Sequence, residues 1–216
     1  MSDGTALRII AIDGPAAAGK GTLARRLAVH FRLPYLDTGL LYRAVGRRVL
    51  VMGEQPFNPA AAELAARLLR PTDLERPDLR DPEADAAAAA VASVPGVRDA
   101  LLHFQRQFGA ENGAVLDGRD IGTVVFPDAS LKLFITATTE ARAKRRWLEL
   151  RDRGVAADIA DVERDIRARD ARDAARTIAP LRPAEDAVVI DTTALDRDQA
   201  FAAALEAAMT RFGRCG

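Results

Sequence analysis

Residues Gly14-Pro15-Ala16-Ala17-Ala18-Gly19-Lys20-Gly21-Thr22 form a loop bounded by two glycines, with a lysine directly after the second of them. Residues 7–12 before the loop are mostly apolar, as in a short buried parallel strand. Behind the loop, apolar residues recur every four positions and predict a helix over residues 20–32. Between a strand and a helix, such a loop presents backbone N–H groups to a phosphate chain, and Lys20 neutralises the phosphate oxygens. The sequence therefore predicts that residues 14–22 bind phosphate.

Four further apolar segments predict strands, and helical patterns separate them. They cover residues 33–36, 115–116, 131–135 and 187–190. Five strands that alternate with helices predict an α/β protein with a parallel sheet flanked by helices. We expect a core made of residues 1–37, 109–150 and 184–216. Residues 38–108, which are mostly helix-patterned, would form an insert, and residues 151–183, rich in charge around a helical stripe, a short mobile lid.

The composition is that of an ordinary globular protein, with 216 residues, of which 49% are hydrophobic and 29% charged. The 31 basic residues balance the 31 acidic ones, so no overall positive field attracts nucleic acid or an anionic membrane. The single cysteine, Cys215, excludes a disulfide framework within one chain. Neither a signal peptide nor a membrane-spanning run is visible, and we expect a cytoplasmic monomer.

The residue after Lys20 departs from the common G-x-x-x-x-G-K-[ST] pattern, because Gly21 stands there and the first hydroxyl comes at Thr22. This departure disfavours a switch GTPase or a motor ATPase. The sequence Gly-Lys-Gly-Thr is instead typical of nucleoside monophosphate kinases of the adenylate kinase type. Those enzymes pass a phosphoryl group to a second nucleotide, so a second anion site is required.

The segment Asp37-Thr38-Gly39 offers such a site, because it follows the second predicted strand and precedes a helix. Thr38 is the predicted N-cap of that helix, and Arg43 follows in its first turns. Arg43 would hold an acceptor phosphate. Taken alone, the segment fits a capped loop with an exposed arginine equally well.

The segment Asp117-Gly118-Arg119-Asp120-Ile121-Gly122-Thr123 follows the third predicted strand. Ligands of open α/β sheets bind at such carboxyl ends. Arg119 can make a bidentate contact to phosphate, and Asp120 can accept from an exocyclic amine, as carboxylates do with cytosine N4. The alternative is a charged turn closed by its own ion pair.

A third group of candidates lies in the predicted lid, at spacings of four, three, four and three residues. Its members are Val162, Ile166, Arg169, Asp173 and Arg176. These spacings put all five on one helical stripe, so the charged members are expected to point inward at a ligand. The charges off the stripe, such as Arg164, Arg167 and Arg172, are expected to face solvent.

Arg142, Arg145 and Arg146 form an arginine cluster after the fourth predicted strand. They would face the phosphates of a nucleotide donor, or they would lie on a solvated helix face with Glu149 as the partner of Arg145. The sequence leaves both interpretations open.

These motifs, in this order and over almost the whole chain, resemble those of bacterial cytidylate kinases. The most specific is Asp117-Gly118-Arg119-Asp120-Ile121-Gly122-Thr123-Val124-Val125-Phe126-Pro127. The resemblance implies a P-loop nucleoside monophosphate kinase fold with an acceptor-binding insert and a lid. It also implies transfer of the γ-phosphoryl group of ATP to CMP or dCMP with Mg²⁺, in pyrimidine nucleotide metabolism.

The resemblance also implies a role for each candidate residue. Arg43, Arg119 and Arg176, with Thr38, would bind the acceptor; Arg98 and Asp120 would read the cytosine; and Arg169 and Asp173 would address the sugar. Lys20, Arg119 and Arg176 would carry the catalysis. No metal ligand is assigned firmly, although Thr22, or Asp37 through water, suits Mg²⁺.

Two departures from the family pattern bear on acceptor selectivity. The family usually has a serine that touches the base where this chain has Ala89, and residues that form extra strands elsewhere are missing around positions 69–79. One lost neutral hydrogen bond costs about 0.5–1.5 kcal/mol, so weaker CMP binding or relaxed rejection of UMP is expected rather than inactivity. The alternatives are a non-catalytic nucleotide-binding module and a P-loop kinase with another acceptor such as UMP.

Overall fold

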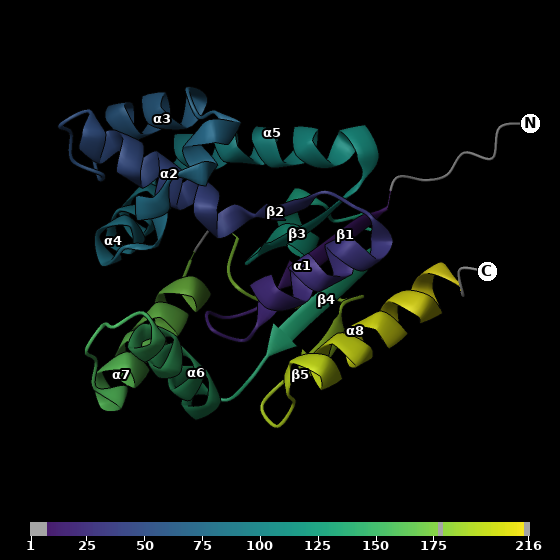
Figure 1. Cartoon of the computed structure of the whole chain (residues 1–216). Helices are drawn as coiled ribbons and strands as arrows, with labels where there is room; N and C mark the ends of the chain where they lie inside the picture. The colour runs from purple at the N-terminus through teal and green to yellow at the C-terminus, as the bar shows by residue number, and fades with distance from the viewer. Residues whose placement is uncertain (1–7, 177–178, 214–216) are drawn as a thin grey trace, which may run out of the picture. The chain divides into compact units, whose positions relative to one another are not determined.

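The computed structural model describes residues 8–176 and 179–213, and its chain divides into two compact units (Figure 1). The first unit contains the described residues up to Leu36 and from Asn112 onward. The second unit is Asp37–Glu111. Strands occur in the first unit, and the second is helical but for Asp37, the last residue of β2. The predicted α/β class with a five-stranded parallel sheet flanked by helices is confirmed.

The sheet of the first unit has the strand order β2-β3-β1-β4-β5. The strands are β1 (Ile9–Asp13), β2 (Tyr35–Asp37), β3 (Ala114–Gly118), β4 (Leu131–Thr136) and β5 (Val188–Asp191). Strand β1 pairs in parallel with both β3 and β4, and β4 pairs in parallel with β5. All the residues of β1 and β3 are buried, which is why these segments are so apolar. Strands β2 and β5 lie at the two edges of the sheet, and Val188 and Val189 of β5 are exposed.

Two helices, α1 (Lys20–Phe31) and α8 (Arg197–Phe212), pack against the sheet and each other. The predicted stripe of α1 buries Leu23 and Leu27 in the core. Helix α8 contributes Ala204 and Ala208 to the same core, and a capping box begins it at Asp196. The apolar sides of both helices therefore close one core with β1, β3 and β4.

Two more helices of the first unit, α6 (Thr139–Asp152) and α7 (Ile159–Ala174), pack against one another. Their small apolar cluster is built from Ala143, Val162 and Ile166. Ala17 of the phosphate loop also packs on this cluster. Helix α7 therefore presents the predicted stripe to α6 and to the loop, and the off-stripe arginines are exposed as expected.

The second unit is made of helices joined by two short 3₁₀ turns. They are α2 (Thr38–Val51), α3 (Pro59–Arg67), η1 (Pro71–Glu75), η2 (Pro77–Arg80), α4 (Pro82–Val91) and α5 (Pro95–Asn112, whose last residue belongs to the first unit). The N-cap of α2 is Asp37, whose carboxylate accepts from Leu40 N–H, so the prediction of Thr38 as N-cap was wrong. Aspartate is as good an N-cap as threonine, and here the chain turns one residue earlier.

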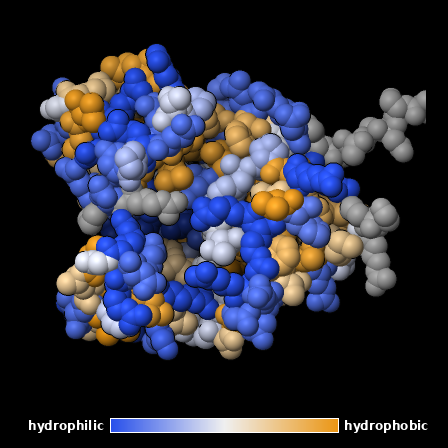
Figure 2. Space-filling view, viewed as in Figure 1, coloured by the Kyte–Doolittle hydropathy of each residue, from blue (hydrophilic) through white to orange (hydrophobic). Residues whose placement is uncertain are grey.

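The surface seen in Figure 2 is mostly hydrophilic, with small apolar patches between the polar side chains. No helix among residues 8–176 and 179–213 is long and apolar enough to cross a membrane.

Helices α2 and α4 approach one another closely at Gly46. A Cβ added to Gly46 would lie 2.7 Å from Ala87 Cβ and 2.8 Å from the carbonyl carbon of Ala87. Carbon atoms in contact lie about 3.5–4.0 Å apart, and the Ala87 backbone has no side-chain freedom with which to yield. Glycine at position 46 therefore sets the spacing of these two helices.

The substitution Gly46→Ala is expected to destabilise the protein by about 1–3 kcal/mol, because the added methyl group overpacks the contact of α2 with α4. At an open helical site the same change would stabilise by up to about 1 kcal/mol, so the sign of the effect is diagnostic. Urea unfolding measures it. Val51→Ala, an exposed change on the same helix, should stay within about 0.5 kcal/mol of the parent protein. A Gly46→Ala protein as stable as the parent would contradict the close packing.

Candidate functional site

The phosphate loop connects β1 to α1, in the setting that the sequence predicted. Gly14 has φ +143°, and a Cβ there would lie 2.0 Å from Ile135 O, so no other residue fits. Gly19, with φ +94°, is the N-cap of α1 and makes no side-chain cap. The N–H groups of the first turn of α1 are therefore not covered by a capping side chain, which is the arrangement that binds anions.

Lys20 is held inside its own loop. Its side chain is buried, and Nζ donates to Pro15 O at 2.7 Å. Burial, and next the positive charge of Arg119, lower the pKa of Lys20 to about 7, while Asp117 acts in the opposite direction. A desolvated ammonium group with one carbonyl partner is ready to exchange that partner for a phosphate oxygen.

Two buried carboxylates lie near the carboxyl ends of the neighbouring strands, Asp13 as the last residue of β1 and Asp117 as the last but one of β3. Asp13 accepts from the backbone N–H groups of Ile121 at 2.8 Å and Gly122 at 2.7 Å. Asp117 accepts from the hydroxyl of Tyr35 at 3.0 Å. Burial raises the pKa of Asp13 to about 6, against the lowering effect of its two N–H partners. Both carboxylates lie at the carboxyl ends of the strands, where ligands of such sheets bind.

Arg119 and Arg176 meet at one carboxylate. Arg119 Nε donates to Asp173 Oδ2 at 3.0 Å, and Arg176 Nη2 donates to Asp173 Oδ1 at 2.5 Å. The side chain of Asp173 is 4% exposed. Helix α7 ends at Ala174, so Arg176, the last member of the predicted stripe, lies beyond the helix yet still reaches Asp173. The structure thus brings together three residues that the sequence had placed in two separate motifs.

Two other predicted residues lie within electrostatic range of this group. The charge of Arg169 lowers the pKa of Lys20, and the charge of Asp120 raises the pKa of Asp13. Both side chains are half-buried. Lys20, Arg119, Arg169 and Asp173 therefore belong to one charged cluster of the first unit.

Arg142 is buried and joins the loop to both helices that pack beside it. It donates to Ala137 O at 3.0 Å, to Ala16 O at 3.4 Å and to both carboxylate oxygens of Asp170, at 3.0 and 2.6 Å. The sequence analysis assigned no role to Asp170, although its place four residues after buried Ile166 puts it on the inner face of α7.

The solvated-face interpretation of the arginine cluster was wrong for two of its members. Arg142 is buried, and Arg145 donates to Thr192 Oγ1 at 3.0 Å and to Thr192 O. The partner of Glu149 is Arg146, at 2.9 Å, and not Arg145. In a helix an arginine reaches a glutamate three residues on as well as four, so sequence spacing did not decide between the two.

In the second unit, Arg43 is paired with a residue that the sequence analysis missed. Arg43 Nε donates to Asp85 Oδ1 of α4 at 2.8 Å, and the two side chains are only 20% and 25% exposed. Asp85 lies one helical turn before the exposed Ala89, on the same side of α4. Thr38 is buried, and Arg98, on α5, is half-buried.

A chain of ion pairs holds the 3₁₀ segment of the second unit. Arg47 pairs with Asp78 at 2.7 Å and with Glu83, and Arg48 pairs with Asp73 at 2.9 Å. Hydrogen bonds from Arg76 and Arg47 hold the pKa of Asp78 down, to about 2. These side chains are structural partners of α2 rather than candidates for ligand binding.

Within the part of the chain that the structure describes, no group of three or more His, Cys, Asp or Glu could hold a metal ion. Mg²⁺ in phosphate-transfer sites is bound mainly by substrate phosphates and water, with one or two protein ligands, so the residues present fit that mode. Thr22, in the first turn of α1, offers an exposed hydroxyl there. Asp37 uses one carboxylate oxygen for its N-cap bond.

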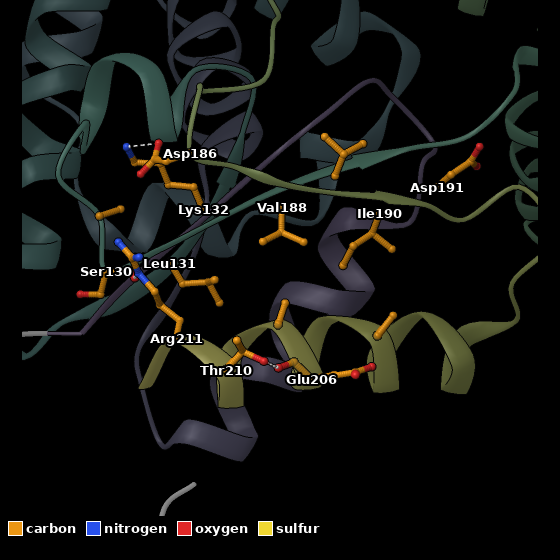
Figure 3. Close-up of a pocket in the computed structure, with 14 residues that line it drawn as sticks. Ser130, Leu131, Lys132, Asp186, Val188, Ile190, Asp191, Glu206, Thr210 and Arg211 are labelled. Carbon is orange, nitrogen blue, oxygen red and sulfur yellow. Dashed lines mark hydrogen bonds and ion pairs between the residues drawn. The ribbon is translucent and has the colours of Figure 1, made fainter. Parts of the chain in front are cut away.

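A cavity of about 690 Å³ lies between β4, β5 and α8 (Figure 3). Val188 and Ile190 point into it from the sheet, and the ion pair of Lys132 with Asp186, at 2.7 Å, lies at one end. None of the predicted site residues lines it. The cavity therefore has no part in the nucleotide site.

The family model described as cytidylate kinase matches residues 10–210 of the chain. The cytidylate kinase of Granulibacter bethesdensis is 66% identical over 193 residues, which are 89% of this chain and 92% of that protein. The enzyme of Acidiphilium cryptum, also named cytidylate kinase, is 59% identical over 92% of this chain and 93% of that protein. A third cytidylate kinase, from a Caulobacter species, is 51% identical over 95% and 97%.

Two solved structures are similar in fold. An uncharacterised protein from Eubacterium ventriosum has a TM-score of 0.56 and 18% identity, over 95% of this chain and 99% of that one. TT1252 from Thermus thermophilus has a TM-score of 0.51 and 22% identity, over 97% and 98%. At these identities the likeness bears on the fold alone.

The substitution Arg142→Ala is expected to destabilise the protein by about 2–4 kcal/mol, because it leaves Asp170 and the Ala137 carbonyl without their partner. Trypsin should also cleave faster within residues 151–176, since α7 loses its tie to the loop. Urea unfolding and timed proteolysis measure the two effects.

Arg146→Ala is the matched control, because Arg146 lies on the same helix and pairs with half-exposed Glu149 at the surface. It should change stability by about 0.5 kcal/mol or less. Equal effects of the two substitutions would show that Arg142 does not tie α7 to the loop.

Proposed function

The chain belongs to the cytidylate kinase family and transfers a phosphoryl group from ATP to CMP or dCMP, and on that premise we propose which of its residues perform each step. The observation that carries the proposal is the convergence of Lys20, Arg119 and Arg176 around the phosphate loop and Asp173. These three side chains would provide the positive charge that a bound phosphate needs.

The donor phosphates of ATP would lie on the N–H groups of residues 14–22. Lys20 would exchange Pro15 O for a phosphate oxygen, and the phosphate's negative charge would restore the protonated form of the amine. Mg²⁺, when bound, neutralises phosphate charge, and Thr22 is the residue of this loop suited to hold it, with Asp37 through water as the other candidate.

The acceptor phosphate would be held by Arg43, Arg119 and Arg176, with Thr38 in the same role. In the structure Arg119 and Arg176 both donate to Asp173, so the acceptor phosphate would take over these donors from a carboxylate of similar charge. Asp173, relieved of them, would accept from the sugar together with Arg169. Arg98 and Asp120 would read the cytosine.

Catalysis would follow from positioning and charge neutralisation, because phosphoryl transfer needs no nucleophile from the protein. Lys20, Arg119 and Arg176 would stabilise the charge that develops on the transferred group. Residues 38–108 would serve as the acceptor-binding insert and residues 151–183 as a lid that excludes water. We also propose that the enzyme works as a cytoplasmic monomer.

Arg119→Ala is expected to lower transfer to CMP by at least about 100-fold, while ATP binding changes by less than about threefold, because Arg119 contacts the acceptor phosphate rather than the donor chain. Coupled-enzyme kinetics and ATP titration calorimetry measure the two quantities. Arg172→Ala, an exposed arginine on α7, is the control and should leave both unchanged. Loss of ATP binding in Arg119→Ala would overturn the assignment of Arg119 to the acceptor.

ADP formation from ATP and Mg²⁺ should be compared with CMP, dCMP, UMP, AMP and no acceptor. We expect turnover with the cytidine nucleotides and weaker turnover with UMP. Ala89→Ser should improve the preference for CMP over UMP by about 2–10-fold, the value of one neutral hydrogen bond. No turnover above the control without acceptor would contradict the proposed function, and an unchanged preference would remove position 89 from base recognition.

A further inference from the structure

Asp13 is a buried carboxylate to which the proposed chemistry assigns no role. It is the last residue of β1, a strand whose other residues are buried and apolar, and it is 5% exposed. Its two carboxylate oxygens accept from two consecutive backbone N–H groups, Ile121 to Oδ1 and Gly122 to Oδ2. Burying a carboxylate is costly unless it is hydrogen-bonded, so this pair of bonds is what permits Asp13 in the strand.

The turn that Asp13 holds has no local cap. The residues Ile121–Val125 form a single π-helical turn, η3, whose N-cap residue Asp120 makes no side-chain cap. The first N–H groups of the turn are satisfied instead from a strand 108 and 109 residues earlier in the sequence. The position of the turn is therefore set by β1 and not by its own sequence.

The two hydrogen bonds of Asp13 link the phosphate loop, which would bind the donor, to the segment that would bind the acceptor. Asp13 directly precedes Gly14, the first residue of the phosphate loop, and Ile121 directly follows Arg119 and Asp120. A change in the bond between Asp13 and the turn must therefore move Arg119 and Asp120 relative to the phosphate loop.

We propose that Asp13 is a positioning residue that holds Arg119 and Asp120 in register with the phosphate loop and thereby sets the affinity for the acceptor nucleotide. This inference rests on the proposed function, because it assumes that Arg119 and Asp120 contact the acceptor. Asp13 itself touches neither substrate nor metal in this assignment.

Two charged groups act on Asp13 from the elements around it. Lys20 of α1 lowers its pKa and Asp120 raises it. The aliphatic part of Lys132 of β4 lies near Gly122, while its Nζ is bonded to Asp186. Burial exceeds these effects and raises the pKa to about 6, so Asp13 changes charge within an experimentally accessible range.

Protonation of Asp13 has opposite effects on stability and on positioning. Because its pKa is higher in the folded state than the ordinary 3.8, this group makes the protein less stable as pH rises from about 4 to about 6. A neutral carboxyl group, however, accepts more weakly from the two N–H groups than a carboxylate does. Below pH 6 the two hydrogen bonds weaken, while the contribution of Asp13 to the free energy of unfolding increases. A purely structural role therefore predicts no loss of CMP affinity below pH 6, whereas a positioning role predicts such a loss.

The first test is Asp13→Asn, in which the amide oxygen can accept one N–H and the amide nitrogen faces the other. We expect the KM for CMP to rise by about 10-fold and the KM for ATP by less than about threefold. Asp128→Asn removes one charge from the exposed segment after the same turn and should change neither constant. Equal increases in both constants, or no increase, would overturn the proposal.

The second test is the pH dependence of the KM for CMP between pH 5 and 8. The phosphate of CMP titrates in the same range, but it does so equally for both proteins. The ratio of the Asp13→Asn constant to the wild-type constant should therefore fall toward one as the pH drops through about 6. A ratio that stays constant across this range would overturn the proposal.

A third measurement needs no variant, and so covers the case in which Asp13→Asn does not fold. In the wild-type protein, the amide proton resonances of Ile121 and Gly122 should shift together with a midpoint near pH 6. Resonances that do not shift with pH would overturn the proposed effect of Asp13 on Ile121 and Gly122. Arg119→Ala separates the two proposals: if it leaves transfer to CMP unchanged, the proposed role of Arg119 fails. If Arg119→Ala lowers transfer and only Asp13→Asn leaves the KM for CMP unchanged, the failure is confined to Asp13.

Discussion

The carbonyl oxygen of Ile135 occupies the place that a side chain at position 14 would need, and the first unit is built around that contact. Because Gly14 has no Cβ, the chain can pass close to the backbone of β4 and turn directly from β1 into the phosphate loop. Helix α1 then starts at the end of this loop, and no capping side chain covers the N–H groups of its first turn. Asp13 directly precedes this turn and Lys20 lies in the loop that follows it, so the turn positions both residues.

Arginine–carboxylate pairs hold the site in order before any nucleotide arrives. Asp173 holds Arg119 and Arg176, Asp85 holds Arg43, and Asp170 holds Arg142. Each carboxylate keeps a guanidinium in one orientation and satisfies its donors in a poorly solvated place. Under the proposed function, the acceptor phosphate would meet Arg43, Arg119 and Arg176 already oriented, so less conformational freedom would be lost when it binds.

The sequence predicted the parts of this molecule that depend on local pattern. The phosphate loop, the five strands and the helical insert follow from apolar periodicity and from glycines at fixed places. It did not predict which carboxylate each arginine meets, because the pairs of Arg43 with Asp85 and of Arg119 with Asp173 join elements far apart in the chain. The N-cap at Asp37 was missed because two neighbouring residues are both good caps.

Strand β5 leaves one edge of the sheet unpaired among the described strands, and it shows two valines to solvent. Such an edge is a template on which another chain can add a strand and begin to aggregate. Asp186 and Asp191 stand before and at the end of this short strand, and hydrogen bonds to Lys132 and to Thr193 hold their pKa values below the ordinary range. Asp191 thus keeps its negative charge in mildly acidic solution, and like charge there disfavours pairing with a second copy of the strand. The residue that ends the strand therefore also disfavours edge-to-edge association of two sheets.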